Sequence, residues 1–378
     1  MIKTTTNNNG DLIVSPAVPV SNQIGTNQSF YELSPLFLSL AVSSSRNGKY
    51  NLNINDYKNH FYFEYKELGY AIKVPLTAIF NTNDKIKGIL GVAFSTARNC
   101  PSRARGLCQL DNTNLCYAYV GECQGSKKSF NYLQGMGSYY NGLLSSYYFD
   151  LFYKSPEIRA DFKRYCNYYN IDTLRFNLKG DFKNPKDIKC IEYMADMGLN
   201  LTGYTARDDL RPQLLDTLNK HDNIILNGSN IMYTNVFNAV DSIKELLTAP
   251  YQCLGGCYKN GCLNCYKKRG IIITVLLHGS QAGVDLNTPE NRAFIIDCFK
   301  LINLPLTHEI LTANKNLFNG LNNYLVKIGF FKTGAVPDIF LKVTKNGTIK
   351  FDGQNGIINY LRYILKTKGV DPATIGGC

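Results

Sequence analysis

Eight of the twelve cysteines fall into two tight groups that lie far apart in the chain. Thiolates are ligands for zinc and for iron–sulfur clusters, so both groups are candidate metal centres. Disulfides are disfavoured in a reducing compartment, which makes metal binding the better explanation of clustered thiols there. The first group contains Cys100, Cys108, Cys116 and Cys123, and the second contains Cys253, Cys257, Cys262 and Cys265.

The second group carries the more specific spacing. Its four cysteines lie within thirteen residues in the pattern C-x3-C-x4-C-x2-C, with Gly255, Gly256 and Gly261 between them. Glycines let the backbone curl around a tetrahedral four-thiolate zinc knuckle or a cubane cluster. The spacing is compatible with zinc and with an iron–sulfur cluster, although four ligands within thirteen residues favour a cluster. We expect Cys253, Cys257, Cys262 and Cys265 to form one closed metal site.

Short apolar segments alternate with amphipathic helical segments between residues 86 and 285. The apolar segments are Gly88–Phe94, Leu174–Leu178, Leu199–Tyr204, Asn223–Asn230 and Ile271–Ser280. Helical patterns cover Ser138–Tyr169, Asp187–Met197 and the stretch "NVFNAVDSIKELL" at 235–247. Strands that alternate with helices predict parallel pairing, hence an α/β fold with a full or partial (β/α) barrel and a Cys-rich insertion.

Reacting groups of parallel barrels lie at the carboxyl ends of the strands. Here those ends are polar, and the first strand leads directly into the first cysteine group, whose intervals are C-x7-C-x7-C-x6-C. Each single polar position is equally well explained as an ordinary loop residue. Together they resemble a site in which three thiolates hold a cubane and leave one iron open for S-adenosylmethionine. The strand-end residues are Lys179, Gly180, Asp181, Thr205, Arg207, Asn227, Ser229, Asn230, His278 and Ser280.

The stretches "NCPSRARGLC" with "LCYA", "LRFNLKGDF" and "LNLTGYTAR" resemble the phage-derived gene product 88 family. The resemblance covers about Gly91 to His278, and that family is similar to radical S-adenosylmethionine enzymes in strand order. It implies that Cys100, Cys108 and Cys116 ligate a [4Fe-4S] cluster. The intervals of seven residues depart from the common radical-enzyme motif C-x3-C-x2-C and leave Cys123 open as a fourth ligand. It further implies that Gly180 and Asp181 contact the amino group of S-adenosylmethionine. The expected cofactor-binding residues are Gly180, Asp181, Tyr204, Thr205, Arg207 and Ser229.

The domains flanking the barrel differ in composition. Residues 1–28 are polar and Asn/Thr-rich, which predicts a disordered lead, and residues 29–85 predict a cap of mixed structure. Residues 286–378 predict three helices and a hairpin around Asn346-Gly347, the order of a winged helix. From Glu290 to Cys378 there are eleven Lys/Arg against six Asp/Glu, so residues 290–378 are a candidate nucleic-acid surface or, alternatively, a dimerisation module.

The net charge, the apolar runs and the number of histidines limit the classes of protein to which the chain can belong. The net charge of +12 fits a polyanionic partner, although an AT-rich genome gives the same composition. No apolar run approaches a membrane span, and the start lacks an export signal, so we expect a cytoplasmic protein. Only four His argue against a His-rich zinc hydrolase.

Two functions remain: a radical S-adenosylmethionine-like iron–sulfur protein acting on an unknown, nucleic-acid-related substrate, or a zinc-stabilised nucleic-acid-binding protein without catalysis. Cys166, Cys190 and Cys298 are expected in the core.

Overall fold

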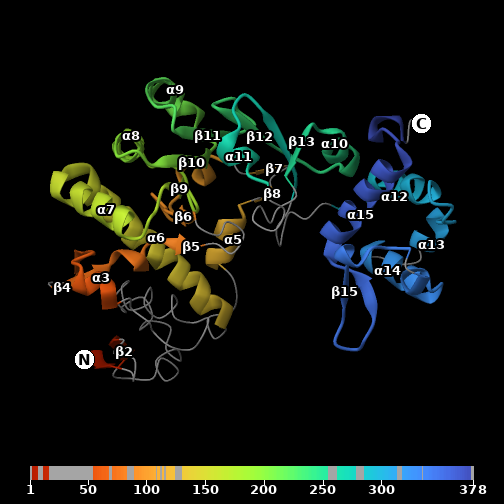
Figure 1. Cartoon of the computed structure of the whole chain (residues 1–378), viewed down its shortest axis with the longest axis horizontal. Helices are drawn as coiled ribbons and strands as arrows, with labels where there is room; N and C mark the ends of the chain where they lie inside the picture. The colour runs from red at the N-terminus through yellow and green to blue at the C-terminus, as the bar shows by residue number, and fades with distance from the viewer. Residues whose placement is uncertain are drawn as a thin grey trace. The chain divides into compact units, whose positions relative to one another are not determined.

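A computed structural model describes most of the chain as two units (Figure 1). Unit 1 comprises Met1–Phe237, Gly256–Ile271 and Gly279–Gln281, and unit 2 comprises the rest. The predicted boundary at 285 therefore differs from the observed division, which assigns 238–255 and 272–278 to the second unit. The described residues are 2–6, 12–16, 54–67, 70–82, 89–107, 109–110, 113–114, 116–123, 130–253, 262–277, 285–312, 317–333 and 335–375.

The core of unit 1 is a mainly parallel sheet. Its described strands follow the order β12-β11-β10-β9-β6-β5, and only β5 is antiparallel to its neighbour. Counting both units, seven described strands run parallel, so the chain is an α/β protein. Because β5 is an edge strand, the strands described in unit 1 form an open sheet and not a closed barrel. The strands are β5 (Asn81–Thr82), β6 (Leu90–Gly91), β9 (Thr173–Phe176), β10 (Asn200–Thr205), β11 (Ile224–Ser229) and β12 (Asn235–Val240), of which residues 238–240 are assigned to unit 2.

Helices cover the apolar face of this sheet. Leu174, Phe176, Leu201 and Leu226 point from neighbouring strands into a core rich in aromatic rings. Phe176 lies where a Cβ on Gly203 would be, so glycine at this position lets the ring pack flat on β10. The helices of unit 1 are α3 (Ile54–Lys58), α4 (Pro101–Ala104), α5 (Tyr117–Cys123), α6 (Phe130–Lys154), α7 (Pro156–Tyr168), α8 (Pro185–Asp196), α9 (Arg211–Lys220) and α11 (Asn264–Lys267).

Two helical expectations need correction. The long pattern Ser138–Tyr169 forms two helices, because Pro156 cannot continue α6 and instead starts α7, with Ser155 as its N-cap. The predicted helix at 235–247 is wrong in its first half: Asn235–Val240 is strand β12, and only Ile243–Thr248 is helical, as α10. Val236, Phe237 and Val240 satisfy a helical spacing, but β12 instead pairs in parallel with β11.

The N-terminal part of unit 1 contains two antiparallel pairs. Within the lead predicted to be disordered, β1 (Ile2–Thr6) pairs with β2 (Leu12–Pro16), and the other residues of 1–28 lie outside the described part. In the predicted cap, β3 (Tyr62–Glu67) pairs with β4 (Tyr70–Pro75), as its alternating pattern indicates, and the short helix η1 (Leu76–Ala78) follows. None of the described helices has the length and hydropathy of a membrane span.

Unit 2 contains the parallel strands β13 (Tyr251–Cys253) and β14 (Ile272–Leu276) and a second core. The expected three helices and hairpin occur in the predicted order, and Thr288 caps the first helix as expected. An additional long helix, α15, follows the hairpin, and sequence analysis missed it. The elements are α10, α12 (Pro289–Lys300), α13 (His308–Thr312), α14 (Leu317–Lys327), β15 (Leu341–Val343), β16 (Ile349–Phe351) and α15 (Gly353–Lys368).

Candidate functional site

The loop that carries the first cysteine group follows β6 and runs beside the end of β9. Val92 donates its backbone N–H to Arg175 O at 2.8 Å, and Ser95 Oγ donates to Asp181 O at 2.9 Å. Gly180 makes this approach close. Its φ is +66°, and a Cβ there would lie 2.7 Å from Thr96 O and against the hydroxyl of Ser95. A glycine at position 180 is thus required by the contact between the two loops.

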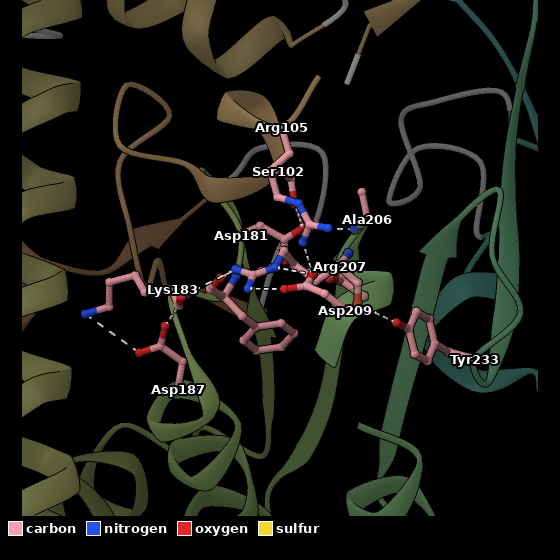
Figure 2. A network of polar contacts seen from close by, with 11 residues as sticks. Ser102, Arg105, Asp181, Lys183, Asp187, Ala206, Arg207, Asp209 and Tyr233 are labelled. Carbon is pink, nitrogen blue, oxygen red and sulfur yellow. Dashed lines mark hydrogen bonds and ion pairs between the residues drawn. The ribbon is translucent and has the colours of Figure 1, made fainter. Parts of the chain in front are cut away.

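Asp181 is the centre of a buried polar network at the strand ends (Figure 2). Its Oδ2 accepts from Ser102 Oγ at 2.7 Å and Ala206 N at 2.8 Å. Its Oδ1 accepts from Thr205 Oγ1, Phe182 N and Asn177 Nδ2 at 2.7, 2.8 and 3.1 Å. Burial raises the pKa of Asp181, while the bond from Ala206 N is the largest of several opposing effects. The carboxylate holds the ends of β9 and β10 and helix α4 together.

A second polar cluster extends from Arg207 (Figure 2). Its guanidinium forms two 2.8 Å bonds with Asp209 and donates to Phe182 O. Arg105, in the first cysteine loop, pairs with the same carboxylate, and the hydrogen bond from Arg207 lowers the pKa of Asp209 to about 2. Tyr233 Oη donates to Arg207 O at 2.7 Å. Arg207 therefore ties the loops after β9 and β10 to the first cysteine loop.

Short contacts connect the segments that carry Cys100 and Cys116: Ser102, two residues after Cys100, donates to Asp181, and Glu122, in the helix after Cys116, accepts from Ala97 N and Arg98 N. Cys100 is 4% exposed and occupies the N-cap position of α4, while Cys116 precedes α5 and accepts from Tyr119 N at 3.4 Å. Burial raises the pKa of both thiols, and backbone N–H groups oppose that rise. Two thiols surrounded by N–H donors suit metal-bound thiolates. Cys123 is exposed, and Cys108 lies outside the described residues.

Lys179 connects the end of β9 to helix α6. Its Nζ donates to the backbone oxygen of Ser138 at 2.8 Å and to its hydroxyl at 2.9 Å. Burial lowers the pKa of Lys179 to about 8, although Glu122 acts in the opposite direction. Glu122, at the end of α5, accepts from Ala97 N and Arg98 N at 3.0 Å each. The first cysteine loop is thereby fixed to α5 as well as to the sheet.

The end of the second cysteine group lies on the polar face of the sheet in unit 1. Thr202 Oγ1 and Asn227 Nδ2 donate to Cys265 O at 3.0 and 3.1 Å. Asn235 Nδ2 donates to Lys268 O at 2.9 Å and to Asn227 Oδ1 at 3.1 Å. Cys265 is 5% exposed. Burial raises the pKa of Tyr204, and the Cys265 thiol acts in the same direction.

The predicted site residues therefore separate into two places. Gly180, Asp181, Thr205 and Arg207 surround the first cysteine loop, whereas the Tyr204 side chain faces Cys265 of the second group. Ser229 is exposed at the end of β11. Cys262 precedes α11, Cys253 lies in β13 of unit 2, and Cys257, His278 and Ser280 lie outside the described part. Among described side chains, no group of three or more His, Cys, Asp or Glu is placed to hold a metal.

Sequence analysis missed Asn177. It is 7% exposed and has a φ of +53°, and its Nδ2 donates to Asp181 Oδ1 and Tyr204 O at 3.1 Å each. Within the described part of the chain its Oδ1 has no hydrogen-bond partner. An unmet buried acceptor costs about 1–3 kcal/mol. An Asn immediately before Leu-Lys-Gly-Asp at a strand end is the signal that could have identified it.

Comparisons with protein-family models, curated proteins and solved structures gave no match to this chain.

Proposed function

We propose that the chain is an iron–sulfur protein of the radical S-adenosylmethionine kind. Cys100, Cys108 and Cys116 would hold a [4Fe-4S] cluster at the carboxyl edge of the sheet. The carrying observation is that Ser102, two residues after Cys100, donates to Asp181 Oδ2 at 2.7 Å, while Glu122, in the helix that Cys116 precedes, accepts from Ala97 N and Arg98 N of the same cysteine loop. Two separate segments thus bring thiols to the edge where parallel α/β folds bind ligands.

The donor set fits such a cluster. Sulfur ligands stabilised by backbone N–H groups favour thiolate-bound iron, and both described thiols accept such bonds. Asp181 already accepts five bonds from the chain, so we assign it, Thr205 and Arg207 to holding the strand ends. Gly180 and Ser229 remain our proposed contacts for S-adenosylmethionine. When bound, the cluster supplies the electron that cleaves S-adenosylmethionine and starts radical chemistry on the substrate.

Anaerobic reconstitution with iron and sulfide tests the proposal. The wild-type protein should turn brown, absorb near about 400 nm and bind about four irons at each cysteine group. Cys100→Ser and Cys116→Ser should each lose about four irons while the second group stays filled. Addition of S-adenosylmethionine should change the electron paramagnetic resonance spectrum of the reduced first cluster, because one of its irons is open.

Cys166→Ser is the matched control, since Cys166 is a buried core thiol in α7 of the same unit. It should keep the full iron content. Equal iron content in Cys116→Ser and Cys166→Ser would contradict the proposal. Cys123→Ser separates the alternatives for the first group: if Cys123 is a fourth ligand, the spectral response to S-adenosylmethionine should appear or grow only after its removal.

The second candidate is a zinc-stabilised nucleic-acid-binding protein. Its supporting observation is the helix, helix, helix and hairpin order in unit 2, with the exposed Lys342 and Lys345 on the hairpin. A colourless protein that contains zinc and no iron after anaerobic purification would favour this function over the first.

A further inference from the structure

Helix α15 (Figure 1), which sequence analysis missed, carries an exposed aromatic side chain, Tyr363. Its ring stacks on Tyr360 with a centroid distance of 6.0 Å and an interplanar angle of 17°, and it lies 5.8 Å from the ring of Phe340. Both of these partners are buried, yet 42% of Tyr363 remains exposed. The two core rings therefore hold the Tyr363 ring in one orientation, and little conformational freedom is lost when a partner packs on its exposed part.

Apolar side chains are also exposed on the elements beside this ring. Ile339 precedes Phe340 in the short helix η4 (Asp338–Phe340), which contacts α15, and it is 83% exposed. Val343 is exposed in β15, which follows η4 directly. Single exposed apolar residues are common on protein surfaces, so these residues indicate a binding surface only together with the charges around them.

The segment that carries these residues is strongly basic. Residues 338–368 contain six Lys or Arg and two Asp, a net charge of +4. Of the two carboxylates, Asp352 is already paired with Lys342 at 3.1 Å. Helix α15 itself contains three Lys or Arg and no Asp or Glu. The parts of unit 2 outside the described residues contain no Asp or Glu either, so they supply no side-chain carboxylate to this surface.

Two of the cations, Arg362 and Lys366, lie on the same face of α15, because residues four apart are neighbours on a helix. The ion pairs found among the described residues of unit 2 include neither of them. Arg362 donates from Nε to Gln252 Oε1 and from Nη1 to Asn359 Oδ1, both at 2.8 Å, and both acceptors are neutral. Burial lowers the pKa of Arg362 to about 10, so it stays protonated at neutral pH. Its hydrogen bonds therefore fix the position of the charge without neutralising it.

An exposed ring beside uncompensated positive charge matches the two parts of a nucleotide. Bases stack on aromatic side chains, and phosphates pair with Lys and Arg. In a duplex the faces of the bases are covered by their neighbours, so a ring on the protein surface reaches only an unpaired base. A second copy of the chain fits less well, because its identical face brings the same positive charge.

We propose that this face of unit 2, formed by Ile339, Arg362, Tyr363 and Lys366, binds single-stranded nucleic acid. An unpaired base stacks on Tyr363, and the phosphates next to it are paired with Lys366 and attracted by Arg362. The inference rests on the nucleic-acid-binding candidate above, to which it adds the kind of strand, and it is independent of the iron–sulfur centre. DNA and RNA share this chemistry, since both have base faces and phosphates.

Fluorescence anisotropy of labelled oligonucleotides with the full-length protein at low salt tests the base contact. The probes are oligothymidylate and oligouridylate of about fifteen nucleotides, and an abasic strand of the same length and charge. The wild-type protein should bind the abasic strand at least about fivefold more weakly than oligothymidylate, because that strand has no base to stack. Equal affinity for both overturns the inference. The affinities for oligothymidylate and oligouridylate show whether DNA or RNA is preferred.

Substitution of the ring locates the contact. Tyr363→Leu should bind oligothymidylate at least about fivefold more weakly and the abasic strand like wild type, whereas Tyr363→Phe keeps the ring and should stay within about twofold. A loss of equal size with the abasic strand would mean that Tyr363 supports the fold and not the base, and it contradicts the inference.

Tyr168→Leu is the matched control for the ring. Tyr168 is also an exposed helical tyrosine, in α7 of unit 1, and its ring packs on Phe61 and Tyr169. Its affinity for oligothymidylate should stay within about twofold of wild type. Equal losses in Tyr363→Leu and Tyr168→Leu would show that no particular tyrosine receives the base, against the inference.

Salt dependence tests the phosphate contact separately. Lys366→Ala should lower the slope of log affinity against log salt by about 0.7, as expected for one phosphate of a single strand, whereas Tyr363→Leu should leave the slope unchanged. Lys163→Ala, at an exposed position of α7, should keep the wild-type slope. A wild-type slope in Lys366→Ala contradicts the assignment of a phosphate to this face.

The wild-type measurements separate this inference from the candidate on which it rests. Binding of a duplex without binding of single strands keeps the candidate and removes the inference. Absence of binding to every probe removes both, and a dimer that Tyr363→Leu dissociates then assigns the face to a second copy of the chain. The iron content of the protein affects neither result.

Discussion

At the residue scale, Gly180 and Asp181 show that a motif in one sequence can predict the position of a residue without predicting its role. The sequence places a Gly-Asp pair at a strand end, and the structure places it there. Its role follows from Ser102, Asn177, Thr205 and Ala206, which donate to Asp181 from separate segments. One sequence does not reveal which distant donors converge on a carboxylate, so a ligand contact and an internal support look alike.

Gly180→Ala should destabilise unit 1 strongly. The added Cβ combines an unfavourable positive φ with a close approach to Thr96 O, which belongs to backbone and yields little. Gly198→Ala is the control, since its φ is also positive but nothing lies within 4 Å of its Cβ. We expect Gly180→Ala to lose at least about 2 kcal/mol more than Gly198→Ala, which itself costs about 1–2 kcal/mol. Urea unfolding measures both, and equal losses would contradict the close contact.

At the element scale, alternation predicted the parallel sheet but not every strand. The correct segments, such as β9, β10 and β11, are flanked by clear helices. β12 failed because its connection to β11 is only five residues long, whereas parallel neighbours usually need a longer crossover. Asn235 stabilises this pairing through its hydrogen bond to Asn227. The spacing of apolar residues does not indicate such a polar contact.

The contact between α6 and α8 should make stability depend on pH. Asp187, in α8, accepts from Lys183 N and lies 3.7 Å from Lys183 Nζ, which also bonds to Ser146 and Asp150 of α6. Burial raises the pKa of Asp187 from 3.8 to about 6, despite the opposing effect of Lys183. Between these values the folded state binds more protons than the unfolded chain. The free energy of unfolding should therefore fall as pH rises from about 4 to 6.

Asp187→Asn should remove this component, which amounts to about 3 kcal/mol for a shift of about two units. Denaturation of both proteins at several pH values gives the difference, which should level off above about pH 6. Asp161→Asn, at a half-exposed carboxylate paired with Arg164, should retain the wild-type slope. A wild-type slope in Asp187→Asn would show that another group titrates.

At the scale of the whole molecule, the chain has two separate hydrophobic cores. The composition of the chain is an average over both units, so it says little about the function of either. The aromatic core of unit 1 supports the polar strand ends, and the core of unit 2 supports helices and a hairpin. Cys166, Cys190 and Cys298 are buried in these cores, as predicted from their helical context. The third helix of unit 2 is less available than its Asn-rich sequence indicates, because Asn322 bonds internally to Phe318 O and Phe351 N.

Nucleic-acid binding by unit 2 should therefore depend on its hairpin more than on α14. Lys342 and Lys345 are exposed there, and Lys342 is 3.1 Å from Asp352 in an ion pair that a phosphate could replace. Replacing both lysines by Ala should weaken binding of the full chain to any duplex and lower its salt dependence by about one unit of slope per lost phosphate contact. Lys154→Ala with Lys163→Ala removes the same charge from exposed positions in unit 1 and should leave both quantities near wild type. Fluorescence anisotropy between low and physiological salt measures them.

Equal losses in the two double variants would mean that the net charge of +12 acts without a defined surface, and no binding at low salt would assign the hairpin to packing or assembly.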